Sequence, residues 1–88
     1  SITEDDETTV RLKVYGKQVM YIRLLKIHES QEEIKTTPEY SIFEYHIKPT
    51  FEFEQELLSH GESVEVLEPA YLRERIKKRL EWSLEHYK

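Results

Sequence analysis

Apolar and polar side chains alternate strictly along the first well-patterned segment of the chain, Thr8–Tyr15. Val10, Leu12 and Val14 fall on one side of an extended chain, whereas the residues between them are polar or charged. A period of two predicts a β-strand with one buried face. The segment is therefore expected to lie in a sheet that is covered on one side.

The following segments predict a helix and then a β-hairpin. Residues 17–27 carry apolar side chains in a spread too wide for one strand, which favours a helix packed on a sheet. Glu32–Thr36 and Tyr40–Ile47 lie on either side of the triplet TPE, so they are expected to form a hairpin that turns at Pro38. The face of the second strand that is expected to be buried consists of Phe43, Tyr45 and Ile47.

The rest of the chain predicts a helix, a short strand and a longer final helix. Thr50 is a suitable N-cap for a helix over residues 51–60, and Gly61 suits the left-handed conformation that ends many helices. Residues 63–67 are expected to form the short strand. Proline is tolerated in the first turn of a helix, so the final helix is expected to span residues 69–87.

The predicted order is strand, helix, strand, strand, helix, strand and one extra helix. This βαββαβ order is typical of ferredoxin-like α+β domains, in which two helices cover one face of a four-stranded antiparallel sheet. The extra C-terminal helix must bury its own apolar side chains against that body or against a partner. These side chains are expected to be Leu72, Ile76, Leu80 and Tyr87, with Leu84 at the edge of the set.

The composition fits a single folded domain. In 88 residues, 38% are hydrophobic, and six Tyr, three Phe and one Trp are present, which is enough for one core. The absence of cysteine excludes disulfides and thiolate zinc sites. No apolar run approaches the roughly 20 residues needed to span a bilayer. We therefore expect a cytoplasmic protein that does not associate with a membrane.

Charge is distributed unevenly along the chain. The formal net charge is −5, and all four residues from 4 to 7 are acidic. Residues 1–7 are therefore interpreted as an acidic linker end, and residues 8–88 as a single domain. The only methionine is Met20, so the chain is expected to be a fragment of a longer protein.

The last third of the chain carries a more specific pattern. This pattern covers residues 57–87, LLSHGESVEVLEPAYLRERIKKRLEWSLEHY. A helix ends at LL and is followed by a glycine and the strand VEVL. A proline, the pair LR and a helix that ends in tyrosine complete the pattern. This combination resembles WCX, the C-terminal extension that follows the WYL domain in bacterial transcriptional regulators. HESQ at 28–31 and KPTFEFEQELLSHG at 48–61 also resemble the family, but TPE replaces its usual glycine turn. The matching positions are Leu57, Leu58, Gly61, Val64, Val66, Leu67, Pro69, Leu72, Arg73 and Tyr87.

The resemblance implies a place in a larger regulator. Similar proteins carry an N-terminal winged-helix DNA-binding domain, a WYL domain thought to sense nucleic acid or another ligand, and then a ferredoxin-like extension that takes part in dimer contacts. We therefore expect a non-catalytic C-terminal regulatory or dimerisation domain that works within a homo-oligomer. Its expected partners are the WYL domain of the same or a partner chain and, through the N-terminal domain, DNA.

A second set of side chains on the final helix, the basic–aromatic stripe, is the candidate contact surface. Its members are Tyr71, Arg75, Lys78, Arg79 and Trp82, and four of them follow the spacing i, i+4, i+7, i+11 along one side of the helix. Such side chains anchor protein interfaces, or stack on bases and neutralise phosphates. A solvated face that only flanks the buried side chains is the alternative. We favour a partner interface, with a domain that binds a small ligand or single-stranded nucleic acid as the rival.

Arg73 belongs to the LR pair and lies at the edge of the apolar side chains of the final helix. It is expected either to bind an anionic group or to form an ion pair with Glu65 or Glu68. The ion pair is favoured, and an exposed pair of this kind contributes only about 0 to 1 kcal/mol.

Catalytic and metal-binding functions have little support in the sequence. A phosphatase of the acylphosphatase type needs an asparagine, and the chain contains none. The four histidines show no metal-ligand spacing. Glu52, Glu54 and Glu56 suit the positive end of a helix dipole without acid–base chemistry. We expect no catalytic residue, no metal and no cofactor.

Overall fold

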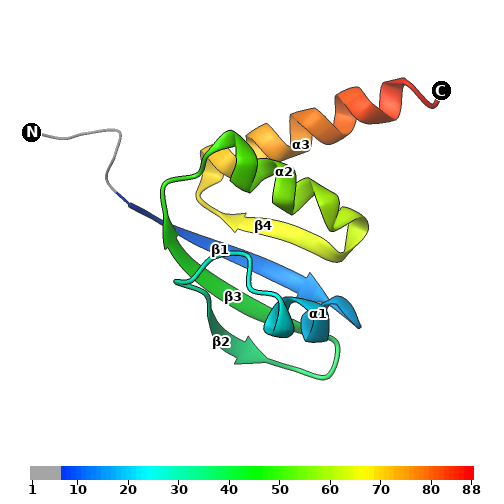
Figure 1. The fold of residues 1–88 in the computed structure, drawn as a ribbon. Helices are drawn as coiled ribbons and strands as arrows, with labels where there is room; N and C mark the ends of the chain where they lie inside the picture. The colour runs from blue at the N-terminus through cyan, green and yellow to red at the C-terminus, as the bar shows by residue number, and fades with distance from the viewer. Residues whose placement is uncertain (1–6) are drawn as a thin grey trace, which may run out of the picture.

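The computed structural model describes residues 7–88, so most of the predicted acidic linker end lies outside the described residues. The chain forms one antiparallel sheet with the strand order β2-β3-β1-β4 (Figure 1). The strands are β1 (Thr8–Tyr15), β2 (Glu32–Thr36), β3 (Tyr40–Ile47) and β4 (Val64–Glu68). The helices are α1 (Gln18–Leu24), α2 (Phe51–Ser59) and α3 (Ala70–Glu85), and a short 3₁₀ helix, η1 (Gly61–Ser63), precedes β4.

The element order is the one predicted from the sequence, and the α+β class is confirmed. β1 lies between β3 and β4, with Leu12 opposite Phe43 on one side and opposite Val66 on the other. In an antiparallel pair, residues directly opposite each other point to the same face, so these three side chains meet on one side of the sheet.

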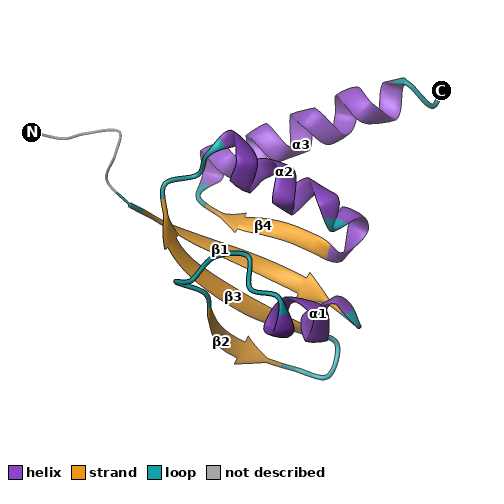
Figure 2. Ribbon diagram, viewed as in Figure 1, coloured by secondary structure: helices purple, strands orange, loops and turns teal. Residues whose placement is uncertain are grey.

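Side chains from all three helices pack on this face. Figure 2 shows α1 and α2 in front of the sheet, and α3 beyond the edge formed by β4. Burial of each large apolar side chain contributes roughly 1.5 to 3 kcal/mol relative to exposure. The buried apolar core consists of Val10, Leu12, Val14, Val19, Ile22, Phe43, Tyr45, Phe53, Leu57, Val66, Leu72 and Ile76.

The helix predicted over residues 17–27 is shorter in the structure. α1 ends at Leu24, and Leu25 has left the helical conformation with φ −119° and ψ 83°. Only Val19 and Ile22 of its apolar side chains are buried, whereas Leu24 is 78% exposed. The prediction of a longer helix packed along the sheet was therefore wrong at its C-terminal end.

Gln31 gives the physical reason for this early end. Its Nε2 donates to the carbonyl of Ile22 at 3.0 Å, and its Oε1 accepts from the backbone N–H of Ile27 at 3.2 Å. The same Oε1 accepts from the Tyr45 hydroxyl at 2.6 Å. A side chain thus replaces the backbone hydrogen bonds of the next helical turn, and the chain crosses to β2.

The boundaries of α2 agree with the sequence prediction. The Thr50 hydroxyl accepts from the backbone N–H of Phe53 at 3.1 Å, which is an N-cap hydrogen bond. Gly61 adopts φ +59° directly after the helix, a conformation that L side chains rarely adopt. α2 is therefore fixed at both ends by residue types that were recognisable in advance.

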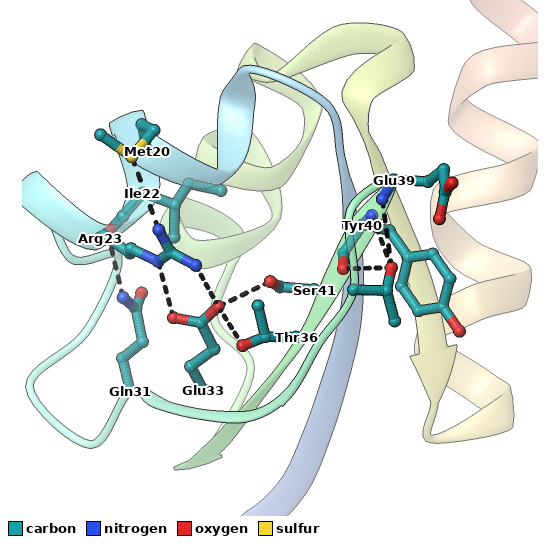
Figure 3. A network of polar contacts seen from close by, with 10 residues as sticks. Met20, Ile22, Arg23, Gln31, Glu33, Thr36, Glu39, Tyr40 and Ser41 are labelled. Atoms are coloured by element: carbon teal, nitrogen blue, oxygen red, sulfur yellow. Dashed lines mark hydrogen bonds and ion pairs between the residues drawn. The ribbon is translucent and has the colours of Figure 1, made fainter.

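A polar network beside α1 joins that helix to the hairpin (Figure 3). The Arg23 guanidinium donates from Nε and Nη2 to the two carboxylate oxygens of Glu33, each at 2.8 Å. Glu33 also accepts from the hydroxyls of Ser41 at 2.6 Å and Thr36 at 2.9 Å. These hydrogen bonds, those from Arg23 above all, lower the pKa of Glu33 to about 2 from an ordinary value of 4.5.

The depressed pKa of Glu33 predicts a stability change in acid. Above pH 4.5 the carboxylate is ionised in both the folded and the unfolded chain, so its stabilising effect is complete. As the pH falls from 4.5 towards 2, the unfolded chain takes up a proton first and this contribution is lost. Glu33→Gln is therefore expected to lower the urea midpoint at neutral pH and to flatten its decline below pH 4.5.

Glu62→Gln is the control for this titration, because Glu62 is exposed and has no ion-pair partner among residues 7–88. This variant should follow the unaltered chain across the same pH range. An equal acid response from Glu33→Gln and the unaltered chain would contradict the role given to the network.

The face of the sheet opposite the core is held by ion pairs and cation–π contacts. Arg11 Nη2 lies 2.8 Å from Glu44, and Arg11 Nη1 lies 3.3 Å from Glu68. Lys13 Nζ lies 4.3 Å from the centre of the Tyr40 ring. Many of the charged groups on this face therefore already have partners within the domain.

Candidate functional site at the terminal helix

The two halves of α3 have different surroundings. Leu72 and Ile76 belong to the core, whereas every residue from Leu80 onwards is exposed. Leu84 is 55% exposed and Tyr87 is 85% exposed. In Figure 1 the C-terminal end of α3 extends away from the rest of the domain.

The prediction that Leu80 and Tyr87 are buried was therefore wrong for this chain by itself. The reason is the gap that opens between β4 and the second half of α3. Leu80 lies only about 15 Å along the helix from Ala70, within the roughly 16 Å that β4 spans, but a groove separates the two elements there and the end of α3 extends away from the domain (Figure 1). The apolar side chains continue along the helix beyond the surface that could cover them.

The middle of α3 is fixed to α2 by a buried carboxylate. The Glu54 side chain is only 5% exposed. Its Oε2 accepts from Arg75 Nε at 2.8 Å and from Arg75 Nη2, and its Oε1 accepts from Arg79 Nη1 at 3.2 Å. We call these three residues the Glu54 cluster. The hydrogen bond to Glu54 raises the pKa of Arg75.

Each guanidinium of the Glu54 cluster also contacts an aromatic ring. Arg75 lies 5.8 Å from the centre of the Tyr71 ring, and Arg79 lies 4.9 Å from the centre of the Phe51 ring. Both separations are within the range of cation–π attraction. Sequence reasoning placed Glu54 at the helix dipole and missed this cluster, because spacing along α3 does not show which side chains α2 presents to it.

The structure does not present the basic–aromatic stripe as one free surface. Arg75 and Arg79 turn towards Glu54, and Tyr71 stacks beside Arg75. Lys78 and Trp82 remain exposed, Trp82 to 64%, and neither has an ion-pair or ring partner among residues 7–88. The cations of the stripe thus divide into two that hold the fold and one that is open to solvent.

Arg73 lies on the other side of α3, against the outer edge of β4. Its Nη1 donates to Glu65 at 2.7 Å and to the carbonyl of Val66 at 2.8 Å. Glu65 also accepts from the Tyr15 hydroxyl at 2.8 Å. These contacts, those from Arg73 above all, lower the pKa of Glu65. The guanidinium is already engaged within the domain, and its side chain remains 49% exposed.

A groove runs between β4 and the exposed half of α3. It has a volume of about 310 Å³ and a mainly apolar lining. We call it the β4–α3 groove. Sequence reasoning did not find it, although the four-residue spacing of Ile76, Leu80 and Leu84 marks one of its walls. The lining residues are Val64, Glu65, Val66, Arg73, Ile76, Lys77, Leu80, Glu81 and Leu84.

Comparison with known families accounts for most of the chain. A family model described as the WCX domain matches residues 6–82. The chain belongs to the WCX family. The match includes the whole sheet and ends within α3 at Trp82, so Leu84 and Tyr87 lie beyond the matched part of this WCX domain. A search of curated proteins found no match to the chain.

The histidine side chains of this WCX domain have different polar partners. The nearly buried His60 has Nδ1 at 2.7 Å from Gln18 Nε2, and its Nε2 lies 3.5 Å from Glu56. His28 Nδ1 lies 2.8 Å from the Ser30 hydroxyl. Across residues 7–88, no three His, Asp or Glu side chains gather closely enough to hold a metal ion.

The length and polarity of the helices bear on membrane insertion. α3, the longest helix described, has 16 residues and carries charged side chains along its length. In the part of the WCX domain that the structure describes, no helix is both long enough and apolar enough to cross a bilayer.

Proposed function

We propose that this WCX domain is a non-catalytic assembly and regulatory domain of a WYL-type transcriptional regulator, and that α3 makes its main protein contact. The observation that carries the proposal is the pair of exposed leucines on the second half of α3. Leu80 is 49% exposed and Leu84 is 55% exposed, and they lie one turn apart on the same side of the helix. An apolar surface of this kind on a small domain marks a contact with another protein.

The family gives the proposed context. WCX domains are associated with WYL regulators, so the WYL domain of the same or a partner chain and a DNA-binding domain are the proposed neighbours. The βαββαβ order with strands arranged β2-β3-β1-β4 supports a ferredoxin-like assignment. A cytoplasmic location would suit a regulator of this kind.

A non-catalytic role agrees with the polar groups of the domain. The carboxylates of Glu33, Glu54 and Glu65 each accept hydrogen bonds from arginine. A general base needs access to a substrate proton, and the Glu54 carboxylate is both buried and occupied. These groups are better suited to holding the fold than to chemistry.

The mass of the chain in solution tests the proposal. Light scattering from micromolar to millimolar concentration is expected to show a monomer–dimer equilibrium. Trp82→Ala and Leu84→Ser should each leave the circular dichroism spectrum unchanged, because both side chains are exposed. At least one of them should weaken dimerisation, whereas Glu29→Ser, on the loop between α1 and β2, should not. A monomer at every concentration would remove self-association from the proposal.

A nucleic-acid contact is the second candidate, and Lys78 and Trp82 favour it. They are exposed and one helical turn apart, as a base-stacking ring and a phosphate contact would require. Salt-sensitive binding of a single-stranded oligonucleotide, weakened by Lys78→Ala, would support this candidate over assembly. Arg75→Ala is a poor probe, because it also breaks the Glu54 cluster.

A further inference from the structure

We propose that the β4–α3 groove receives the C-terminal half of α3 from a second copy of this chain. In this arrangement the two α3 helices are antiparallel, and their two-fold axis passes close to Leu80. The inference rests on the proposed assembly function and names both the partner and the geometry of the contact.

The groove and its proposed occupant share the same residues. Ile76, Leu80 and Leu84 line the groove, and Leu80 and Leu84 are also aliphatic side chains that the helix leaves exposed. A two-fold interface requires one patch that is complementary to itself. With the axis at Leu80, Leu84 of each copy meets Ile76 of the other, because both lie four residues from the axis. Leu80 then meets its own counterpart.

The charges beside the groove select the antiparallel orientation. Lys77 and Glu81 both line the groove, and neither has an ion-pair partner among residues 7–88. With a rise of about 1.5 Å per residue, the antiparallel arrangement brings Lys77 within about 3 Å, along the helix axis, of Glu81 in the second copy. A parallel arrangement in register would place Lys77 beside Lys77 of the second copy and repel.

The structure favours a helix over a strand as the occupant. A strand added to the edge of β4 would need the free backbone groups of that edge. The carbonyl of Val66 is already bonded to Arg73 Nη1 at 2.8 Å, and this side chain lies across the edge. An incoming helix needs no backbone hydrogen bonds from β4 and leaves this contact intact.

Disulfide trapping tests the position of the axis. The chain has no cysteine, so Leu80→Cys introduces a single protein thiol, and a disulfide between two protein chains can form only through this position. Oxidised glutathione first forms a mixed disulfide with one copy, and the thiol of the second copy then displaces glutathione. With oxidised glutathione as the oxidant, this variant is expected to form a covalent dimer as its main product, because residues at the axis lie within disulfide reach. Glu29→Cys, on the loop between α1 and β2, is the control and should give little covalent dimer.

Charge reversal tests the orientation. Lys77→Glu and Glu81→Lys are each expected to weaken dimerisation by roughly 3- to 30-fold, because two symmetry-related exposed pairs change from attraction to repulsion. The double variant restores opposite charges and should return the dissociation constant to within about threefold of the unaltered chain. Analytical ultracentrifugation measures all four proteins under one salt condition.

The outcomes separate this inference from the proposed function. A covalent dimer of the Leu80→Cys variant, together with rescue by the double charge variant, supports the antiparallel pairing. A dimer that neither cross-links through Leu80→Cys nor responds to charge reversal would overturn the pairing and leave the assembly function standing. A chain that is monomeric up to millimolar concentration would also overturn the pairing.

Discussion

Replacing both Arg75 and Arg79 with alanine is expected to lower the free energy of unfolding by about 2 to 4 kcal/mol. The reason is the carboxylate that they leave behind. Glu54 is 5% exposed, so its buried carboxylate would lose the hydrogen bonds that it accepts from both arginines and find little water to replace them. Urea denaturation followed by circular dichroism measures the loss. For a domain of 88 residues, this is a large part of a total stability of roughly 4 to 13 kcal/mol.

Two further variants test whether the loss of stability comes from the buried Glu54 carboxylate rather than from the removal of any two cations. Lys77→Ala with Lys78→Ala removes two cations from the same helix and should change stability by less than about 0.5 kcal/mol per site. Adding Glu54→Leu to the double arginine variant should restore much of the lost stability, because an apolar side chain suits the buried position. Equal losses in the arginine and lysine variants would show that the Glu54 cluster does not hold α2 to α3.

The second large effect is expected at Leu72. Leu72→Ala should lower the free energy of unfolding by about 2 to 5 kcal/mol, because the side chain is fully buried and its loss leaves a cavity. Leu80→Ala makes the same chemical change two turns further along the same helix, where the side chain is 49% exposed. In dilute, monomeric samples it should change stability by less than about 0.5 kcal/mol.

Comparison of the Leu72→Ala and Leu80→Ala variants therefore shows where along α3 the apolar side chains cease to be buried in the domain. The dimer dissociation constant should respond differently, because Leu80→Ala is expected to weaken dimerisation while the domain stays folded. Comparable losses of monomer stability at the two positions would contradict the exposed position of the second half of α3.

Much of the fold could be predicted from the sequence because local signals were strong. The alternation in Thr8–Tyr15 reports a strand that has one buried face, and the structure has this strand at the same bounds. Thr50 and Gly61 each carry a conformational preference that needs no tertiary contact, and both occupy the helix ends expected of them. Of these features, Gly61 also belongs to the pattern on which the WCX resemblance was based.

The remaining features depend on contacts between distant segments. Gln31 ends α1 by bonding to Ile22, nine residues earlier, and no helix propensity contains that information. Glu54 and Arg79 are 25 residues apart and meet only because α2 and α3 pack together. The exposure of Leu80 depends on the groove that separates β4 from the second half of α3. A periodic pattern shows which side of a helix is apolar, but it does not show how far along the helix the rest of the domain buries that side.

The Glu54 cluster also determines how a movement of α2 reaches the exposed end of α3. The cluster holds the helix up to Arg79, and Glu85, the last residue of α3, lies six residues further along, at a distance of about 9 Å. A tilt of about 10° at the cluster therefore moves the end of α3 by about 1.6 Å, nearly the spacing of one residue along the helix axis. A shift between α2 and the sheet would thus be passed on to the exposed end of α3 and to what it contacts.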